Sequence, residues 1–332
     1  MTSTSHARSV LFLGGSGVIS SACVREAVAA GYEVSVLNRG RTRGRSLPDA
    51  VDVRHADVRD DAAVAAALGE RRFDVVADFL SFHPDDVRRC LAQAGGRAGQ
   101  YVFISSASAY QTPPNRLPIT ESTPLRNPWW DYSRNKIACE DLLIGHYRDS
   151  GLPVTIVRPS HTYDETSPPL FGGWTAVERL LRGAPVLVPG DGTSLWTVTH
   201  ARDFARAFIP LLGNPQAHGE AVHITSDEAV PWNALFTTMA AAAGVEPRLV
   251  HVASDTICAA DPGLTGSLLG DKAHSMVFDN AKARSFAPGW AATTSFAQGA
   301  REIVRWRAEH DIVRGDPAFD ALSDRLVDQA SA

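Results

Sequence analysis

The chain has 332 residues, of which 44% are apolar and 21% charged, and its formal charge is −5. This length allows one large domain or two closely joined ones, and the composition is that of a globular protein with a sizeable core. The acidic balance, with one short basic cluster at Arg39, Arg41, Arg43 and Arg45, argues against nucleic acid as a partner, and no apolar stretch reaches the length of a membrane span.

The cysteines and the N-terminal segment bear on metal binding and location. Cys23, Cys90, Cys139 and Cys258 are scattered and form no CxxC pair, so we expect no metal site. Residues 1–10 are polar and lack the apolar segment of a signal peptide. We therefore expect a reduced, cytoplasmic protein.

Short apolar runs alternate with helical patterns through the first half of the chain. The strands are expected at 9–13, 33–37, 51–54, 73–79, 101–105 and 154–158, and the helices between them at 20–30, 60–68, 84–94 and 130–149. Apolar runs separated by helices of this length predict an α/β fold, a doubly wound parallel sheet of the Rossmann type with helices on both faces.

The alternation of apolar runs and helical patterns ends after about residue 160, where prolines and glycines become frequent. Helices are expected at 201–212, 232–243 and 295–310, and strands at 221–225 and 249–252. We therefore predict a dinucleotide-binding Rossmann domain over 1–165. Residues 166–332 are predicted to form a smaller, mainly substrate-binding lobe that is interleaved with the last elements of the sheet.

A glycine-rich turn separates the first expected strand from the first helix. Glycine allows a tight turn and lets a pyrophosphate approach the backbone, while the helix N-terminus offers N–H groups and a partial positive charge. A turn without ligand is the alternative, but the strand–helix context favours a cofactor. Ser20 stands where a third glycine is usual, and we expect it to loosen the contact between helix and strand slightly. The predicted site comprises Gly14, Gly15, Ser16, Gly17, Val18 and Ile19.

The residues that end the next strands indicate which dinucleotide binds. An NAD enzyme usually places an acid after the second strand, on the ribose hydroxyls. Asn38 removes the repulsion that an acid would exert on a 2′-phosphate and Arg39 can pair with it, which slightly favours NADP over NAD; a solvated loop is the alternative. Asp57 and Val58 are placed to meet the adenine amino group, or Asp57 caps the next helix. Phe79, which ends the fourth strand, is also assigned to the cofactor site.

A tyrosine and a lysine stand four residues apart in the sequence DYSRNK. On a helix this spacing puts Tyr132 and Lys136 on one face. Phenol is a poor base at neutral pH, and a nearby ammonium is expected to lower the pKa of Tyr132. Tyr132 can then exchange a proton with a secondary alcohol while a hydride moves to or from the cofactor, and Lys136 can hold the nicotinamide ribose. A pair of this spacing also occurs often on helix surfaces.

Serines follow the fifth expected strand in ISSASAY. Parallel sheets bind ligands beyond the carboxyl ends of their strands, so a serine there can donate to the same substrate oxygen as Tyr132. Ser105, Ser106 and Ser108 compete for this role, and hydroxyls that merely cap the turn are the alternative.

These segments together resemble the extended short-chain dehydrogenase/reductases of the NAD-dependent epimerase/dehydratase family. The resembling pieces are LGGSGVIS, ISSASAY, YSRNK, VRPSHTY, GDGTSLWTVTHARDFA and FDNAKARSFAPGW. The resemblance implies that Ser106 is the catalytic hydroxyl, and that Pro159, Ser160 and His161 line the nicotinamide. It also implies a homodimer formed through the helices at 84–94 and 130–149.

One departure from the family pattern concerns the substrate. The resemblance places Trp196 where the family usually has an arginine, which binds the diphosphate in nucleotide-sugar enzymes. Tryptophan cannot neutralise phosphate, but it can stack on a ring. Either the substrate lacks a diphosphate, or another arginine such as Arg202 compensates, or Trp196 simply packs in the lobe. Ser108, Trp196 and Arg202 are the candidate substrate contacts, and Trp129, Trp130 and Trp174 are candidates to shape the pocket.

Three functions follow from this reading. The first is an NAD(P)-dependent epimerase that oxidises a sugar-type secondary alcohol to a transient ketone. The second is an NADPH-dependent ketoreductase or dehydrogenase of a sugar or secondary metabolite. A dehydratase is disfavoured because Ala107 and Ser108 replace the acidic pair that follows the catalytic hydroxyl in family dehydratases. The third is a non-catalytic protein like the RNA-binding relatives of this family, which the net acidity opposes.

Overall fold

The computed structural model describes residues 8–40, 45–310 and 315–331, so the first seven residues, Arg41 and Arg43 lie outside the described part. Its centre is a seven-stranded sheet in which all neighbouring strands are parallel. The strands, in spatial order, are β10 (Ala221–Ile224), β6 (Val154–Pro159), β5 (Ala98–Ile104), β4 (Phe73–Asp78), β1 (Ser9–Leu13), β2 (Glu33–Asn38) and β3 (Asp52–His55). This confirms the predicted doubly wound fold.

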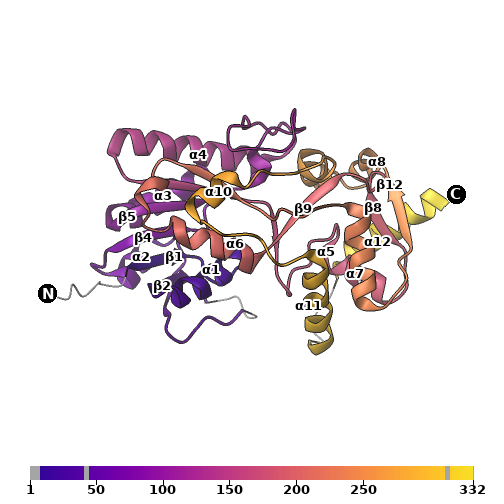
Figure 1. Ribbon diagram of the computed structural model, residues 1–332, viewed down its shortest axis with the longest axis horizontal. Coiled ribbons are helices and arrows are strands. Elements are labelled where there is room, and N and C mark those ends of the chain that lie inside the picture. Colours follow the sequence, from indigo (N-terminus) through magenta and orange to yellow (C-terminus); the bar gives the residue numbers. More distant parts are fainter. Residues whose placement is uncertain (1–7, 41–44, 311–314, 332) are drawn as a thin grey trace.

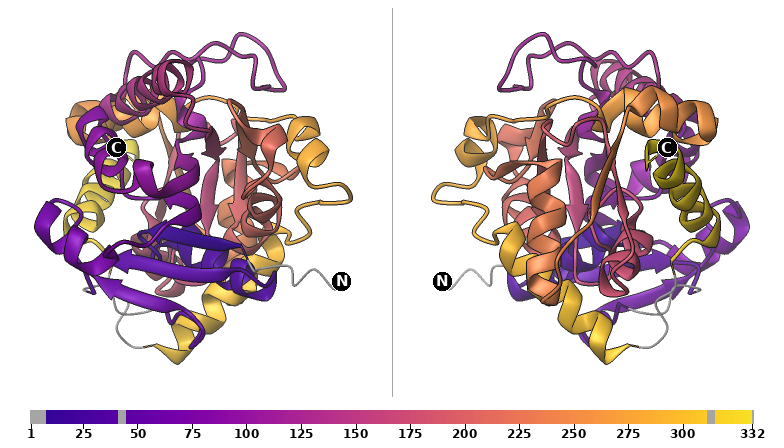
Figure 2. Two further views of the ribbon diagram at one scale, coloured as in Figure 1. Left: turned by 90° about the vertical axis from the view of Figure 1, so that its left-hand side faces the viewer. Right: turned by 90° about the vertical axis from the view of Figure 1, so that its right-hand side faces the viewer.

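Helices cover both faces of this sheet (Figures 1 and 2). Successive strand residues point to opposite faces, so Val10 and Phe12 pack in one core while Leu11 and Leu13 pack in the other. The first core is closed by α1 (Val18–Ala29), α6 (Ala201–Phe208) and α10 (Ala281–Phe286), and the second by α2 (Asp61–Leu68), α3 (Pro84–Ala94) and α4 (Asp131–Ser150).

The strand order reverses between β1 and β4. In register, Leu13 lies beside Leu37 on one side and beside Asp78 on the other. The chain therefore leaves β1, β2 and β4 at one edge of the sheet, and the crevice at such a switch point is where open α/β sheets bind ligands. The glycine turn, Asn38 and Phe79 are brought together there by topology alone.

The other end of the molecule carries two small sheets and a separate core (Figure 1). One sheet is formed by β11 (Ala229–Pro231), β9 (Leu195–His200) and β7 (His161–Tyr163), and the other by β12 (Leu249–Val252) and β8 (Val186–Pro189). Around them lie α5 (Gly173–Leu181), α7 (Trp232–Ala243), α8 (Ser254–Ala260), α11 (Phe296–Glu309), α12 (Pro317–Ser331) and the π-helical turn η6 (Leu268–Lys272).

Several of these elements were not expected from the sequence. The strands β8 and β9 and the helices α5 and α12 fall in proline- and glycine-rich or unassigned segments. Helix α12 is held by ion pairs from the buried Arg179 to Asp320 and Asp324, contacts about 140 residues apart that no local pattern reveals. The expected interleaving is present, because β10 and α10 return to the large sheet; the domain limits themselves stay a prediction.

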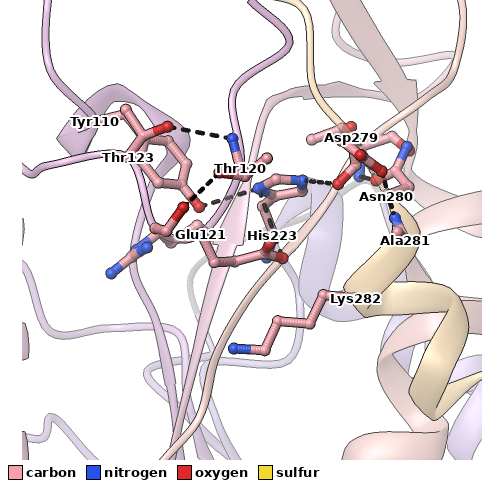
Figure 3. Close-up of polar contacts among 12 residues, drawn as sticks. Tyr110, Thr120, Glu121, Thr123, His223, Asp279, Asn280, Ala281 and Lys282 are labelled. Carbon is pink, nitrogen blue, oxygen red and sulfur yellow. Dashed lines mark hydrogen bonds and ion pairs between the residues drawn. The ribbon is translucent and has the colours of Figure 1, made fainter. Parts of the chain in front are cut away.

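A buried polar network joins the edge of the sheet to the segment before α10 (Figure 3). The ring of His223, on β10, contacts Tyr110 Oη at 3.0 Å and the carbonyl oxygen of Asp279 at 2.8 Å. Burial lowers the pKa of His223, so the ring is neutral and can donate through one nitrogen and accept through the other. Arg158 packs over the ring of Tyr110 and forms a buried ion pair with Glu140 on α4.

Candidate active site

The turn after β1 requires glycine at two successive positions. Gly14 has a φ of +82°, a conformation that residues with a side chain rarely adopt. A Cβ atom on Gly15 would lie 2.6 Å from the side chain of Val36 on β2. The chain therefore passes close under β2 before α1 begins at Val18.

Ser20 has a capping role that was not expected from the sequence, and its expected loosening of the helix–strand contact stays a prediction. Its side chain is buried, and its Oγ accepts a hydrogen bond of 2.9 Å from the N–H of Gly17, the residue that caps α1. Ser20 therefore closes the first turn of the helix, as a capping-box residue does. It also occupies one of the N–H groups that a phosphate would otherwise use.

A cavity of about 690 Å³ opens at the switch point. Its size and its polar rim fit an extended dinucleotide, with the N-terminus of α1 at one wall. The expected cofactor residues that lie outside the lining of this cavity are Gly15, Val18, Ile19, Tyr132, Lys136, Pro159, Ser160 and His161. The lining includes Gly14, Ser16, Gly17, Ser20, Asn38, Arg39, Arg45, Asp57, Val58, Arg59, Phe79, Phe82 and Arg89.

The rim of this cavity at the end of β2 carries arginines. Arg39 is exposed and makes no hydrogen bond or ion pair with another described residue. Asn38 Oδ1 accepts from the N–H of Gly40 and contacts His55, so it fixes the bend of this loop. Asp57 accepts from the N–H of Arg59 and pairs with its side chain at 3.5 Å, which places the Arg59 guanidinium at the same rim.

The candidate catalytic hydroxyls meet beside α4. Ser106 Oγ lies 2.9 Å from Ser108 Oγ, which in turn accepts from Ser133 Oγ at 2.7 Å. Burial raises the pKa of Tyr132, and the hydrogen bond from Ser106 acts in the opposite direction. Ser105, the third serine considered, is turned away and donates to Glu140. The structure thus selects Ser106 and Ser108 as the serines that face the same space as Tyr132.

Lys136 is held away from the tyrosine hydroxyl. Its Nζ donates to the carbonyl oxygens of Ser81 and Ile104, both at 2.7 Å, and lies over the rings of Phe82 and Phe103. Burial lowers the pKa of Lys136 to about 8. The expected lowering of the Tyr132 pKa by this ammonium is therefore not found in the described structure, because burial dominates and Lys136 is bound to the backbone.

A second, smaller cavity of about 230 Å³ lies on the other side of Tyr132. The rings of Tyr132 and Phe82 are 6.1 Å apart, and each lines one of the two cavities. The lining of the smaller one comprises Ser106, Ala107, Ser108, Trp130, Tyr132, Pro159, Ser160, His161, Trp196, Thr197, Asp271, Lys272, Met276 and Phe278. The expected serine, tyrosine, proline–serine–histidine and tryptophan positions are thus brought to one place.

Two residues in this lining have strongly altered environments. Burial, and secondarily the charge of Lys272, lower the pKa of His161 to about 3, so this ring stays neutral. Trp196 is buried and stacks on Trp232 with ring centroids 5.2 Å apart. Trp196 therefore both packs in the lobe and forms a wall of the cavity.

Other expected substrate contacts lie elsewhere. Arg202 pairs with Glu302 at 2.6 Å and is not among the lining residues, so its compensating role stays a prediction. Of the remaining tryptophans, Trp130 lines the cavity, Trp129 is exposed, and Trp174 donates to the carbonyl oxygen of Thr166.

The cavities also contain residues that sequence reasoning missed. Asp271 and Lys272 reach the smaller cavity from η6, a segment without a recognisable pattern. Arg45 reaches the larger one and pairs with Asp164 at 2.6 Å; its place in the short basic cluster was the only available signal. The described residues contain no group of three or more histidine, cysteine or acidic side chains that could hold a metal, and none of their helices is long and apolar enough to cross a membrane.

Comparison with known proteins identifies the family to which this geometry belongs. The model of the NAD dependent epimerase/dehydratase family matches residues 10–225, which include the glycine turn, the serines, Tyr132 and Lys136. The chain belongs to this family. It is therefore an NAD(P)-dependent enzyme of the extended short-chain dehydrogenase/reductase type.

The similar proteins in this family are named for different activities. A chloroplast stem-loop binding protein of Arabidopsis thaliana is 26% identical over 326 residues, 94% of this chain and 78% of the relative. A 2′-dehydrokanamycin reductase of Streptomyces kanamyceticus is 28% identical over 68% of this chain and 64% of the reductase. A UDP-glucose 4-epimerase of Lactobacillus helveticus is 31% identical, but over only 45% of this chain and 50% of the epimerase.

Solved structures agree on the fold. An epimerase of Methanothermobacter thermautotrophicus superposes with a TM-score of 0.76 over 91% of this chain and 93% of the other, at 17% identity. The UDP-glucose 4-epimerase of Thermus thermophilus, solved with NAD, gives a TM-score of 0.71 over 91% and 100% of the two chains, at 22% identity. At these identities the likeness establishes the architecture, and the reaction has to be argued from the site.

Proposed function

We propose that this protein transfers a hydride between NADP and a secondary alcohol of a sugar-type ring. The observation that carries this proposal is the position of Ser106 and Tyr132 in the wall of a small cavity that adjoins the dinucleotide-sized one. A hydroxyl group placed beside both side chains would lie next to the cofactor cavity. The proton can then move to or from the substrate oxygen while the hydride moves to or from the carbon that bears it.

The chain's own residues would do the following in this reaction. Tyr132 Oη gives a proton to the forming alkoxide, or takes it in the reverse direction. Ser106 Oγ, oriented by Ser108 and Ser133, donates to the same substrate oxygen. Lys136, fixed by two backbone carbonyls, is a ribose contact at the junction of the cavities. Bound NADP supplies or accepts the hydride.

NADP is proposed over NAD because of the charges at the end of β2. The position that carries an acid in NAD enzymes is Asn38, and both Arg39 and Arg59 line the rim of the cavity. Guanidinium groups bind phosphate through charge-assisted hydrogen bonds, and Arg39 has no other described partner to give up. A 2′-phosphate at this rim would therefore meet the guanidinium of Arg39, and the nearby carboxylate of Asp57 is paired with Arg59.

Net reduction of a ketone is the form of the reaction that the smaller cavity favours. An epimerase must present both faces of a ketone to the same hydride, so the ring has to turn over within the site. The cavity of 230 Å³, walled by Trp130, Trp196 and Phe278, restricts such a rotation. The reductase among the relatives, named for 2′-dehydrokanamycin, is consistent with this direction.

Epimerisation is the second candidate, and the likeness to UDP-glucose 4-epimerases favours it. An epimerase returns the hydride to its own substrate and needs a cofactor that stays bound, whereas a reductase must exchange it. The experiment is to denature freshly purified protein, identify any released nicotinamide cofactor, and titrate the emptied protein with NADPH and NADH. Reversible NADPH binding by a protein that carries little cofactor supports the reductase; near-stoichiometric retained cofactor supports the epimerase.

The catalytic role of Tyr132 has its own test. Tyr132→Phe removes only the phenol oxygen, so turnover should fall by about 100- to 10,000-fold while NADPH affinity stays close to that of the wild type. Tyr147→Phe, a control on the same helix outside both cavities, should leave turnover unchanged. An equal loss of turnover and cofactor affinity in Tyr132→Phe would contradict the proton-transfer role.

The relative named for stem-loop binding makes an RNA-binding protein the remaining alternative. The proposal of an enzyme is supported by Ser106 and Tyr132, which line the same small cavity, and by Lys136 on the same helix as Tyr132. A salt-dependent mobility shift with a stem-loop RNA, in a protein that transfers no hydride, would overturn it.

A further inference from the structure

The smaller cavity holds an ion pair that neither the fold nor the proposed chemistry explains. Asp271 and Lys272 both line it, and their side chains lie 3.7 Å apart, beyond hydrogen-bond distance. Asp271 is 9% exposed, and its carboxylate interacts with the ammonium of Lys272. A carboxylate offers about four lone-pair sites, so its oxygens can also accept hydrogen bonds from a ligand in the cavity.

The backbone on either side of Asp271 is held in place by neighbours from other parts of the chain. The carbonyl oxygen of Gly270 accepts from Asn127 Nδ2 at 2.7 Å, and the carbonyl oxygen of Lys272 accepts from Trp232 Nε1 at 3.0 Å. Asn127 also donates to the carbonyl oxygen of Ser108, so the same side chain joins η6 to the serine loop. The distance between the ion pair and the candidate catalytic hydroxyls is therefore fixed by the fold.

The two opposite charges lie side by side in the wall of the cavity. After burial, the charge of Asp271 is a further influence that raises the Tyr132 pKa. Lys272 Nζ lies 5.7 Å from the ring centres of both Trp130 and Trp196, and its charge lowers the pKa of His161. Burial raises the pKa of Asp271 itself to about 6, and the charge of Lys272 and its polar contact with the carboxylate act in the opposite direction. The two charges cancel, so the cavity selects for no net charge.

We propose that Asp271 and Lys272 bind neighbouring hydroxyls of an uncharged polyhydroxylated ring, and that the substrate is a neutral sugar or cyclitol ring instead of a nucleoside diphosphate sugar. A hydroxyl can both donate to a carboxylate and accept from an ammonium. Two hydroxyls on adjacent ring carbons therefore match both charges at once. This inference rests on the proposed function, because it takes the cavity beside Tyr132 as the substrate site.

The size and the walls of the cavity agree with this substrate class. A volume of about 230 Å³ is below the roughly 300–1,000 Å³ of pockets for drug-sized ligands, and accommodates a single ring. Trp130 and Trp196 provide flat apolar walls for the carbon skeleton. The charge of Lys272 is offset by Asp271, and Trp196 carries no charge, so the cavity offers no net positive charge to neutralise a phosphate.

The test is a binding measurement that does not depend on turnover. Ligand-observed NMR titrations of the NADPH-loaded protein would compare methyl α-D-glucopyranoside and myo-inositol with glucosamine and UDP-glucose. We expect the two neutral rings to bind more tightly than the cationic and anionic probes. Asp271→Asn should weaken the neutral rings by roughly tenfold, because a hydrogen bond to a charged group is lost. Asp255→Asn, an exposed control with the same charge change, should stay within about twofold of the wild type.

The possible results distinguish a failure of the substrate inference from a failure of the proposed function. Tighter binding of UDP-glucose, or unchanged affinity in Asp271→Asn with an unchanged melting temperature, overturns the inference. Preference for glucosamine also overturns it, since the carboxylate would then select an ammonium. If Asp271→Asn fails to fold, Lys272→Gln tests the same pair through its other member and should also weaken the neutral rings. Neutral-ring binding without hydride transfer contradicts the proposed function alone.

Discussion

Arg39 is the residue on which the choice of cofactor depends most directly. It is exposed at the rim of the larger cavity and has no described partner, so its guanidinium can approach a phosphate without losing an existing contact. Arg59 stands at the same rim but is already paired with Asp57. We therefore expect Arg39 to contribute more than Arg59 to the binding of a phosphate.

Arg39→Ala should weaken NADPH much more than NADH, because only NADPH carries the 2′-phosphate. Loss of one charge-assisted contact predicts a roughly ten- to hundredfold rise in the Kd for NADPH. Fluorescence titration with both cofactors measures this, with Arg25→Ala on the exposed side of α1 as the charge-matched control. Equal losses for NADPH and NADH would remove the case for a phosphate at this position.

Lys136 is a structural residue as well as a candidate ribose contact. Its ammonium satisfies the carbonyl oxygens of Ser81 and Ile104 in a buried position. Lys136→Met should therefore lower the free energy of unfolding by about 1–3 kcal/mol, because both acceptors lose their donor. Lys282→Met, which removes a partly exposed ion pair with Glu220, should cost about 1 kcal/mol or less. Urea unfolding measures the loss in the free energy of unfolding for both variants. Equal losses would show that the two buried hydrogen bonds of Lys136 add no stability.

At the scale of elements, the start of α1 affects both the stability of the fold and the binding of the cofactor. Ser20 Oγ holds the N–H of Gly17 and thereby caps the helix. Ser20→Ala should lower stability by about 1 kcal/mol. The Kd for NADPH should not rise, since the substitution frees an N–H that points toward the cavity. Thermal unfolding and NADPH titration test the two statements separately, with Ser285→Ala on α10 as a control. A weaker NADPH complex would mean that the Ser20 hydroxyl itself binds phosphate.

The elements differ in how well the sequence predicts them. Strands β1, β2 and β4–β6 were recognisable because each is a short apolar run followed by a helical pattern, and α3 and α7 match their expected limits. Strand β9 was not recognisable, because its pairing with β7 and β11 comes from distant parts of the chain. The homodimer expected through α3 and α4 stays a prediction.

The candidate site was predictable only in part. The glycine turn, Ser106, Tyr132 and Lys136 belong to local motifs, so their types and spacing identify them. Asp271 and Lys272 lie more than 130 residues beyond Tyr132, on a turn that no periodicity marks, and only the tertiary structure brings them to the cavity. The orientation of Lys136 toward two backbone carbonyls likewise depends on packing that the sequence does not express.

For the whole molecule, the buried histidines link stability to pH. Burial lowers the pKa of His161, His200 and His223 in the folded protein, so the unfolded chain binds protons at higher pH than the folded protein does. Stability is therefore fully present above about pH 6.5 and falls as the pH drops below that value. Around His223, Arg158 strengthens this effect and Glu121 opposes it.

The melting temperature should accordingly decrease between pH 7.5 and pH 5. His223→Gln should melt lower at pH 7.5, because it disturbs the contacts with Tyr110 and Asp279, but its further decrease toward pH 5 should be smaller than that of the wild type. His146→Gln, for which no comparable buried network exists among the described residues, should follow the wild-type curve. If the melting temperature of His223→Gln falls as steeply toward pH 5 as that of the wild type, this histidine does not cause the pH dependence.

The central claim is that Tyr132 and the cofactor cavity together reduce a ketone on an uncharged ring. The most direct measurement is deuterium transfer from NADPH labelled at the reactive carbon to a panel of mono-oxidised methyl glycosides, followed by mass spectrometry. We predict one deuterium on the new carbinol carbon with the wild type, and labelling slowed by at least about 100-fold with Tyr132→Phe at the same cofactor occupancy. Labelling by Tyr132→Phe at a rate close to that of the wild type, or a protein that binds NADPH and labels no ketone in the panel, would contradict the account.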